Sequence, residues 1–360
     1  MTTEGIDEKQ VTFLAKGYPC DAVPHRDALK AIEPRGFYIR QPPKPHELDQ
    51  EITDDSLLFQ TIHMGAAVVD EDKWTLILDG MVERPLSLSF TQLKSIHRTN
   101  VISFHECYGS PVLPPVKALW RIGNVQWTGV RLADLIRMAR PKAGATYVWS
   151  QGLESGSFAD VSADCFEKDL PMQKALQPEV LVAYEMNGKP LNKNRGGPVR
   201  LVVPGWFGTN STKWLCRLNL QDRRASGPFT TTFYNEVDPN DPSGMTMRPV
   251  WMVEPNSMIV QPMADEVLRG PEVEVWGRAW GCEEIESVDI SIDDGDTWMS
   301  PTDVHLDGRQ MYEWQLFRVR LMLKRPGTYH LVARARDRSG AKQPMVGRRN
   351  HVHRVEVHVA

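Results

Sequence analysis

Short segments of alternating hydrophobic and polar residues recur along this chain, with turn-forming residues between them. Residues 74–80 read W-T-L-I-L-D-G, which predicts a strand that ends in a turn. Residues 86–96 predict a strand followed by a short helix, and residues 101–107 predict another strand. Residues 130–140 place leucine, isoleucine and methionine at helical spacing and predict a helix.

The middle of the chain, from about residue 145 to 250, continues with short predicted strands and turns. The predicted strands are 146–150, 180–185, 199–203 and 213–220, with a short helix over 171–176. There is no regular strand–helix–strand rhythm and no glycine-rich phosphate loop, so a doubly wound nucleotide-binding fold is disfavoured. The pattern favours a mixed α+β fold.

The pattern changes after Pro249, where strand signals follow one another without helices between them. The predicted strands are 257–261, 272–279, 285–292, 314–323, 327–336 and 351–359. Strands at this spacing predict a β-sandwich of immunoglobulin type. We therefore predict an N-terminal arm over 1–50 that is part of the first domain, the rest of that domain over 51–250, and a sandwich over 251–360.

Length and charge agree with this division and exclude some classes of function. At roughly 150 residues per domain, 360 residues predict about two domains. The chain has 42 Lys and Arg against 46 Asp and Glu, a balance that argues against a dedicated nucleic-acid or membrane-surface binder. No apolar run approaches the roughly 18 residues of a membrane-spanning helix. Five widely spaced cysteines and a polar N-terminus favour a reducing compartment, so we expect the cytoplasm.

Cys107 is the first candidate for chemistry. It follows a predicted strand and opens a loop that reads C-Y-G-S-P. A thiolate at the rim of a sheet is a soft metal ligand, although a free cysteine is also often a small buried apolar residue. His105 shares its strand face, so a zinc site with Cys107 is a weaker alternative.

Basic residues form the second candidate group. Arg195, Arg200 and Lys213 flank a glycine-rich turn whose N–H groups can bind a phosphate or another oxyanion. Arg40, within F-Y-I-R, is a candidate anion clamp. For each of these residues a solvated surface position is the alternative.

Taken together, these segments resemble the sulfite oxidase family of mononuclear molybdenum enzymes, from about residue 35 to 360. The segments that carry the resemblance include F-Y-I-R at 37–40, E-C-x-G at 106–109, D-L-P-x-x-K-A-L at 169–176, V-L-V-A-Y-E-M-N-G-x-P-L at 180–191, G-P-V-R-L-V-V-P-G-W-F-G at 197–208 and T-K-W-L at 212–215. In the C-terminal part they are G-R-A-W-G at 277–281, S-I-D-D-G-D-T-W at 291–298 and R-A-R-D-R-S-G at 334–340. The resemblance implies a molybdopterin-binding catalytic domain followed by a dimerisation domain.

The resemblance also implies a cofactor and its ligands. The cofactor is molybdenum held by the dithiolene of one molybdopterin, a pyranopterin, and by the thiolate of Cys107. The positions that match the cradle of the pterin phosphate are Arg200, Ser211, Thr212 and Lys213. Arg195 stands where relatives often carry a cofactor-binding histidine. Arg40 matches an arginine beside the molybdenum that helps to bind an anionic substrate.

Two positions depart from the family pattern. Many relatives read C-x-G-N-R after the metal cysteine, so an active-site arginine is absent from this loop, and Arg121 is a candidate replacement. Phe166 stands where sulfite-oxidising relatives carry a tyrosine beside the metal. A slow enzyme, another substrate and a Tyr-to-Phe substitution are all compatible with that phenylalanine.

We therefore expect an oxidoreductase that converts sulfite to sulfate at molybdenum. Its electrons would go to an external acceptor such as cytochrome c, because the sequence contains no haem-attachment motif. Two alternatives remain open: a reductase of S-oxides, N-oxides or nitrate at the same site, and a binding protein without the cofactor. The sandwich implies a homodimer, since that domain pairs the subunits of relatives.

Overall fold

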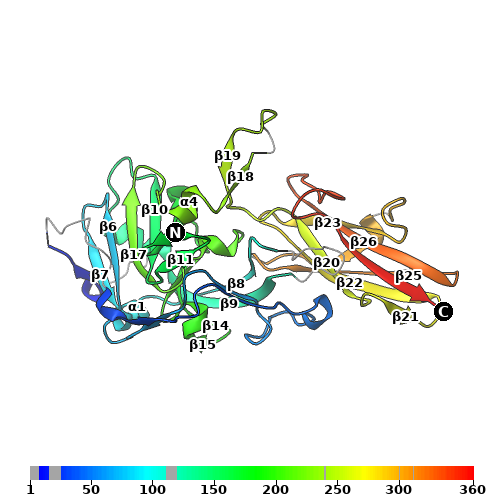
Figure 1. The fold of residues 1–360 in the computed structure, drawn as a ribbon, viewed down its shortest axis with the longest axis horizontal. Helices are drawn as coiled ribbons and strands as arrows, with labels where there is room; N and C mark the ends of the chain where they lie inside the picture. The colour runs from blue at the N-terminus through cyan, green and yellow to red at the C-terminus, as the bar shows by residue number, and fades with distance from the viewer. Residues whose placement is uncertain (1–7, 16–25, 111–119, 239–240, 300, 311) are drawn as a thin grey trace.

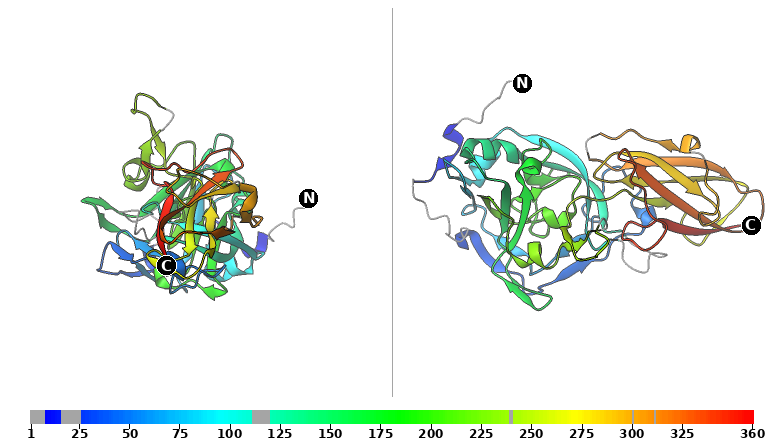
Figure 2. Two further views of the ribbon diagram at one scale, coloured as in Figure 1. Left: turned by 90° about the vertical axis from the view of Figure 1, so that its right-hand side faces the viewer. Right: turned by 90° about the horizontal axis from the view of Figure 1, so that it is seen from above.

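The structure is a computed structural model that describes residues 8–15, 26–110, 120–238, 241–299, 301–310 and 312–360. Two bodies lie side by side along the long axis of the molecule (Figure 1 and Figure 2). Strands dominate both bodies, and the larger one also carries short helices, which confirms the α+β prediction. Cys20 and Pro111 lie outside the described residues.

A six-stranded sheet forms one layer of the larger body, in the order β1–β7–β6–β17–β10–β13. Its strands are β1 (Thr12–Phe13), β7 (Leu86–Ser89), β6 (Thr75–Gly80), β17 (Leu215–Gln221), β10 (Tyr147–Gly152) and β13 (Phe166–Pro171). Strands β17 and β6 are parallel, and the other neighbours are antiparallel. The interior residues of β6 and β17 are almost all buried, because both faces of the sheet are covered there.

A second sheet carries the candidate metal ligand and one of the candidate cations. Its order is β15–β14–β9–β8, with β16 beside β14. Its strands are β15 (Lys189–Pro190), β14 (Leu181–Met186), β9 (Ile122–Arg131), β8 (Thr99–Glu106) and β16 (Arg200–Val202). Strand β8 ends immediately before Cys107, and β16 begins at Arg200.

Short helices and two-stranded ribbons complete this body. The helices are α1 (Phe90–Ser95), α2 (Leu132–Ala139), α3 (Met172–Ala175) and α4 (Pro228–Thr231). The ribbons pair β2 (Leu29–Ile32) with β5 (Ala67–Val69), β3 (Tyr38–Arg40) with β4 (Gln60–Ile62), β11 (Gly156–Phe158) with β12 (Val161–Ala163), and β18 (Asn235–Val237) with β19 (Met247–Pro249). The β18–β19 ribbon projects from the molecule in Figure 1. No helix among the described residues has the length and apolarity to cross a membrane.

The smaller body is the predicted sandwich. One sheet has the order β20–β22–β25–β24 and the other β21–β27–β26–β23. The strands are β20 (Asn256–Gln261), β22 (Glu272–Trp280), β25 (Gln315–Met322), β24 (His305–Leu306), β21 (Glu266–Leu268), β27 (His353–Val359), β26 (Gly327–Asp337) and β23 (Ile285–Ser291). Alternate residues such as Val275, Phe317, Leu331 and Val357 are buried between the sheets, as the period of two requires.

The structure differs from the predicted elements around residue 130. A helix was predicted over 130–140, but β9 continues to Arg131 because Val130 pairs with Val182 of β14. The helix α2 therefore begins at Leu132 and buries Leu132, Leu135 and Ile136.

Candidate active site

Cys107 directly follows the last residue of β8, and it lines a cavity with about 650 Å³ of empty space. Its backbone N–H donates to the carbonyl of Arg121 at 2.9 Å, and its carbonyl accepts from the N–H of Ser110 at 3.0 Å. These bonds fix the position of the thiol. Its Sγ lies 3.6 Å from Thr61 Oγ1 and 3.9 Å from Arg121 Nη1, and the thiol is half-buried. The lining residues are Leu58, Phe59, Gln60, Thr61, His63, His105, Cys107, Tyr108, Glu154, Phe166, Asn194, Arg195, Arg200, Gly208, Thr209, Ser211, Lys213 and Tyr234.

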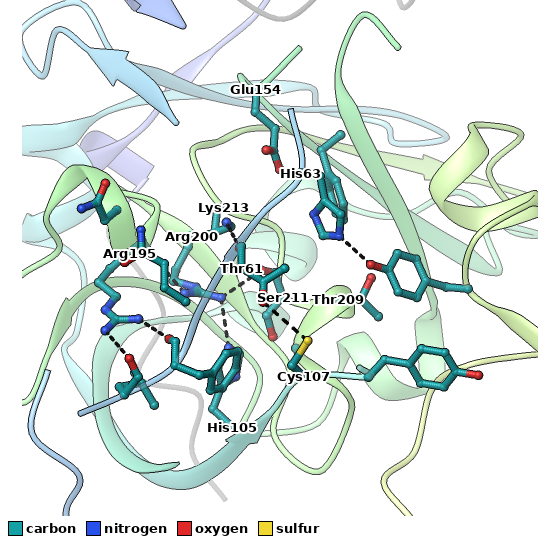
Figure 3. A pocket seen from close by; sticks show the side chains of 18 residues that line it. Thr61, His63, His105, Cys107, Glu154, Arg195, Arg200, Thr209, Ser211 and Lys213 are labelled. Atoms are coloured by element: carbon teal, nitrogen blue, oxygen red, sulfur yellow. Dashed lines mark hydrogen bonds between the residues drawn. The ribbon is translucent and has the colours of Figure 1, made fainter. Parts of the chain in front are cut away.

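Three lining residues, Arg195, Arg200 and Lys213, form what we call the cationic end of the cavity. All three were predicted to bind the cofactor, and Figure 3 shows Arg195 and Arg200 on the side of the cavity away from His63. Arg195 ends a short 3-10 helix, Lys193–Arg195, that is capped by the side chain of Asn192. Its guanidinium pairs with Asp55, donates to the carbonyl of Leu58 at 2.9 Å, and is therefore largely committed to the protein.

Arg200 is held by the protein but is not fully satisfied. Its Nη1 donates to the carbonyl of Arg195 and its Nη2 to the carbonyl of Ser211, both at 3.1 Å. Its Nε is buried and has no partner within the described part of the chain. Burial, and then the charge of Arg195, lowers the pKa of Arg200 to about 9. A buried guanidinium with an unused donor is a ready partner for an anion.

Lys213 lies in the same buried region. Its Nζ donates to the carbonyl of Thr61 at 2.7 Å. Burial lowers the pKa of the ammonium group, the nearby carboxyl group of Glu154 opposes this effect, and Arg200 and Arg195 add to it. Burial also raises the pKa of Glu154. The buried guanidinium of Arg200 and the partly buried ammonium group of Lys213 would gain an anionic partner, and the phosphate of molybdopterin fits this donor set.

Of the two hydroxyl residues predicted for the phosphate cradle, the structure brings only one into the cavity. Ser211 lines it, and its Oγ accepts from the N–H of Val203 at 3.1 Å. Thr212 is fully buried and does not line the cavity, and its hydroxyl lies 2.7 Å from Ser150 Oγ. The side chain of Thr212 therefore joins this turn to β10.

The three residues predicted to be catalytic differ in where the structure places them. Phe166 lines the cavity, with its ring centroid 5.5 Å from that of His63. Arg121 lies against the Cys107 thiol, and its buried Nε has no partner among the residues that the structure describes. Arg40 does not line the cavity, because its Nη2 donates to the backbone carbonyls of Asp55 and Leu58.

His105 shares the strand face of Cys107, as predicted, but its ring is directed to the cationic end. Its Nε2 lies 3.5 Å from Arg200 Nη2, and its ring stacks on Phe59 with centroids 5.5 Å apart. Burial and the charge of Arg200 hold the pKa of His105 well below its usual value. His105 is therefore a neutral neighbour of the buried guanidinium.

Sequence reasoning missed His63, Glu154 and Tyr234. His63 Nε2 lies 2.5 Å from the hydroxyl of Tyr234, while its buried Nδ1 has no partner in the described ranges. Burial and the charge of Lys213 lower the pKa of His63 to about 3, and burial raises the pKa of Tyr234. The cavity thus contains a tyrosine hydroxyl, supplied from position 234. The three residues share no spacing in the sequence, so no local signal identifies them.

The sandwich contacts the segment that carries Cys107. Trp280 Nε1 donates to Glu106 Oε2 at 2.8 Å, and burial raises the pKa of Glu106 to about 7. Arg349 donates to the carbonyls of Tyr108 and Ser110, and its guanidinium carbon lies 3.4 Å from the centroid of the Tyr108 ring. The position of Cys107 is therefore fixed in part by the second body.

A thiol beside a cationic end, on an α+β body joined to a β-sandwich, is the arrangement that the sequence resemblance implies for a two-domain molybdopterin-binding oxidoreductase. Comparisons with known proteins agree. Residues 63–229 match the oxidoreductase molybdopterin binding domain, and residues 248–359 match the Mo-co oxidoreductase dimerisation domain. The chain belongs to the sulfite oxidase family of molybdenum oxidoreductases, as the sequence resemblance predicted.

Similar proteins include sulfite oxidases and one solved dehydrogenase. Mitochondrial sulfite oxidase of Homo sapiens is 31% identical over 84% of this chain, and the match spans 58% of that protein. Sulfite oxidase of Arabidopsis thaliana is 28% identical, with 89% of each chain covered. The sulfane dehydrogenase SoxCD of Paracoccus pantotrophus has the same fold, with a TM-score of 0.77 at 24% identity, over 98% of this chain and 90% of that one.

Proposed function

We propose that this chain exchanges two electrons with a sulfur compound at a molybdenum cofactor and passes them singly to an external acceptor. Sulfite, the substrate named in the relatives, is the first compound to test, with sulfate as its product. The observation that carries the proposal is the cavity itself, because the Cys107 thiol and the buried donors of Arg200 and Lys213 face one space.

Molybdopterin, when bound, would supply a molybdenum that cycles by two electrons and exchanges an oxygen atom with sulfur. Cys107 is the residue that would ligate the metal, since thiolates are soft ligands. Arg200, Lys213 and Ser211 would hold the phosphate. The backbone carbonyl of Arg195 accepts a hydrogen bond from Arg200 Nη1, so Arg195 helps to position that guanidinium.

Tyr234 and His63 would donate hydrogen bonds and hold protons beside the reacting sulfur. Because His63 is neutral at pH 7, the Tyr234 hydroxyl can donate to its Nε2, which places the ring proton on Nδ1. Among the described residues that buried N–H has no acceptor, so a substrate oxygen would satisfy it. A preorganised donor of this kind contributes on the order of 10²-fold in rate.

Arg121 is the described cation that lies against the Cys107 thiol, so a thiolate at this position would be stabilised by its charge. We keep the catalytic roles of Arg121, Arg40 and Phe166 as predictions. A cytoplasmic location, cytochrome c as the electron acceptor and a homodimer formed through the sandwich also remain predictions.

The experiment is a paired measurement of metal and turnover. The purified protein is expected to contain about one molybdenum per chain and to reduce ferricyanide when sulfite is added. Cys107→Ser is expected to abolish turnover. A molybdenum-loaded enzyme that gives no turnover with sulfite, organic sulfides or sulfoxides would contradict the proposal, and a metal-free protein would support the binding-protein alternative.

A further inference from the structure

A second group of metal-ligating side chains lies on the sandwich, outside the cavity already described. Asp265, Glu356 and His358 each place one ligand atom within 4.8 Å of the other two. Glu356 and His358 are two residues apart on β27, so both side chains leave the outer face of that strand. Asp265 directly precedes β21, and its backbone N–H donates to the carbonyl of Glu356 at 2.8 Å. Two distant segments of the sequence therefore meet at this group.

Strand β26 adds a second imidazole to this group. His330 is the antiparallel partner of Glu356, and Thr328 is the partner of His358. His330 Nδ1 lies 3.7 Å from Glu356 Oε2, and His358 Nε2 lies 3.6 Å from Glu356 Oε1. Each oxygen of the Glu356 carboxylate therefore faces one imidazole. We call Asp265, His330, Glu356 and His358 the sandwich cluster. Its strand β27 runs to the end of the sandwich that is remote from the larger body (Figure 1).

The spacing of these atoms is that of ligands around one metal ion. A hydrogen-bonded pair of a histidine and a carboxylate is present elsewhere on the sandwich, where His305 Nε2 lies 2.8 Å from Asp307 Oδ1. The separations of 3.6 Å and 3.7 Å in the sandwich cluster are too long for such a bond. Two ligands of a tetrahedral zinc ion, each bonded at about 2.0–2.1 Å, lie about 3.3 Å apart. Small side-chain rotations would therefore bring the cluster to metal-binding distances.

The second nitrogen of His358 is held as in a metal ligand. Its Nδ1 lies 3.1 Å from Thr328 Oγ1. When Nδ1 carries the ring proton and donates to this hydroxyl, Nε2 presents its lone pair to the two carboxylates. Ligating histidines are oriented by such a bond from the other ring nitrogen. Among the described residues neither Asp265 nor Glu356 forms a salt bridge with a lysine or an arginine. A cation between Nε2 and the carboxylates would therefore satisfy all three groups.

We propose that the sandwich cluster is a binding site for one divalent transition-metal ion of the zinc type. Asp265, Glu356 and His358 are three of its ligands, and His330 is the fourth. Two imidazoles with two carboxylates suit zinc, whereas calcium and magnesium prefer oxygen ligands alone. The ion joins β26 and β27 to the turn before β21, and it stabilises the sandwich because it binds the folded chain. The site is separate from the cofactor site, since none of its residues lines the cavity.

The first test measures Zn²⁺ binding to the full chain loaded with molybdenum, by competition with a chromophoric chelator. We expect about one tightly bound Zn²⁺ per chain. His358→Gln is expected to weaken this binding at least 100-fold while the molybdenum content stays unchanged. The matched control is His305→Gln, which removes a hydrogen-bonded histidine from the same sandwich and is expected to keep the wild-type affinity. A wild-type chain that does not bind Zn²⁺, an unchanged affinity of His358→Gln, or equal losses in both variants overturns the proposal.

The second test uses the hydroxyl group that orients His358. Thr328→Val keeps the shape of the side chain but removes its oxygen, so Zn²⁺ is expected to bind about 10–100-fold more weakly. Thr328→Ser keeps the hydroxyl and is expected to bind Zn²⁺ as the wild type does. Excess Ca²⁺ is not expected to displace the Zn²⁺. Displacement by Ca²⁺, or an affinity of Thr328→Val equal to that of the wild type, would overturn the assignment of His358 as a ligand.

Discussion

Replacing Arg200 by methionine separates cofactor binding from protein stability. Burial lowers the pKa of Arg200 from the usual value of an arginine to about 9, so keeping it protonated costs the cofactor-free protein on the order of 5 kcal/mol. Methionine removes that cost but leaves the carbonyls of Arg195 and Ser211 without their donor, at about 1–3 kcal/mol each. We therefore expect the cofactor-free variant to be about as stable as the wild type, or up to roughly 3 kcal/mol more stable.

The assay has two parts and a matched control. Urea unfolding of cofactor-free protein gives the stability, while molybdenum analysis and pterin fluorescence of protein from a cofactor-producing host give the loading, which we expect to fall at least tenfold. The control is Arg217→Met, since Arg217 is also buried but pairs with Asp79 at 2.9 Å. Breaking a buried pair costs about 3–5 kcal/mol, so this variant is expected to be destabilised.

The pH dependence has a defined sign. Below pH 9 Arg200 is protonated in both the folded and the unfolded chain. Only the folded chain then carries the free-energy cost of a buried charge. Above pH 9 the folded chain releases this proton, while the unfolded chain keeps it up to the usual, higher pKa of an arginine. The free energy of unfolding of the wild type therefore rises relative to that of the variant as pH increases. If Arg200→Met is destabilised as strongly as Arg217→Met, or keeps its cofactor, the proposed phosphate site is wrong.

Three further substitutions test the remaining parts of the site. Tyr234→Phe is expected to lower kcat on the order of 10²-fold, because it removes the hydroxyl bound to His63; an unchanged kcat would exclude the proton role. Phe166→Tyr is expected to change kcat less than about threefold, since Tyr234 already supplies a hydroxyl; a tenfold gain in steady-state turnover would contradict this. Trp280→Phe removes the donor to Glu106 and is expected to cost about 1–3 kcal/mol in urea unfolding; an unchanged midpoint would show that this hydrogen bond is not stabilising.

The parts of the site that lie on one strand or turn could be predicted from the sequence. Cys107 follows directly on β8, so the strand pattern locates it. Arg200 and Lys213 flank one turn region, so the local motif places these two cations near each other. Strand β9 was not predicted because nearly all of its residues are buried on both faces, which removes the alternation that marks a half-buried strand.

The backbone contacts of Arg40 could not be predicted from its motif. Its type suits an anion clamp, yet its guanidinium donates to carbonyls of Asp55 and Leu58, in the loop between β3 and β4. Such backbone bonds are not visible in a sequence, because they depend on how a connecting segment folds back on its own strand.

The sequence by itself determined the two-domain order and the α+β and sandwich classes, since periodicity is a property of contiguous residues. Its resemblance to a known family predicts Cys107 as the cofactor ligand. Only the tertiary structure decided which residues surround the His63 side of the cavity. His63, Phe166 and Tyr234 come from three separate segments, and they meet because α4 packs on β13 and the ring of His63 contacts the rings of Phe166 and Tyr234. Their charge state is also a tertiary property, because burial rather than residue type makes His63 neutral.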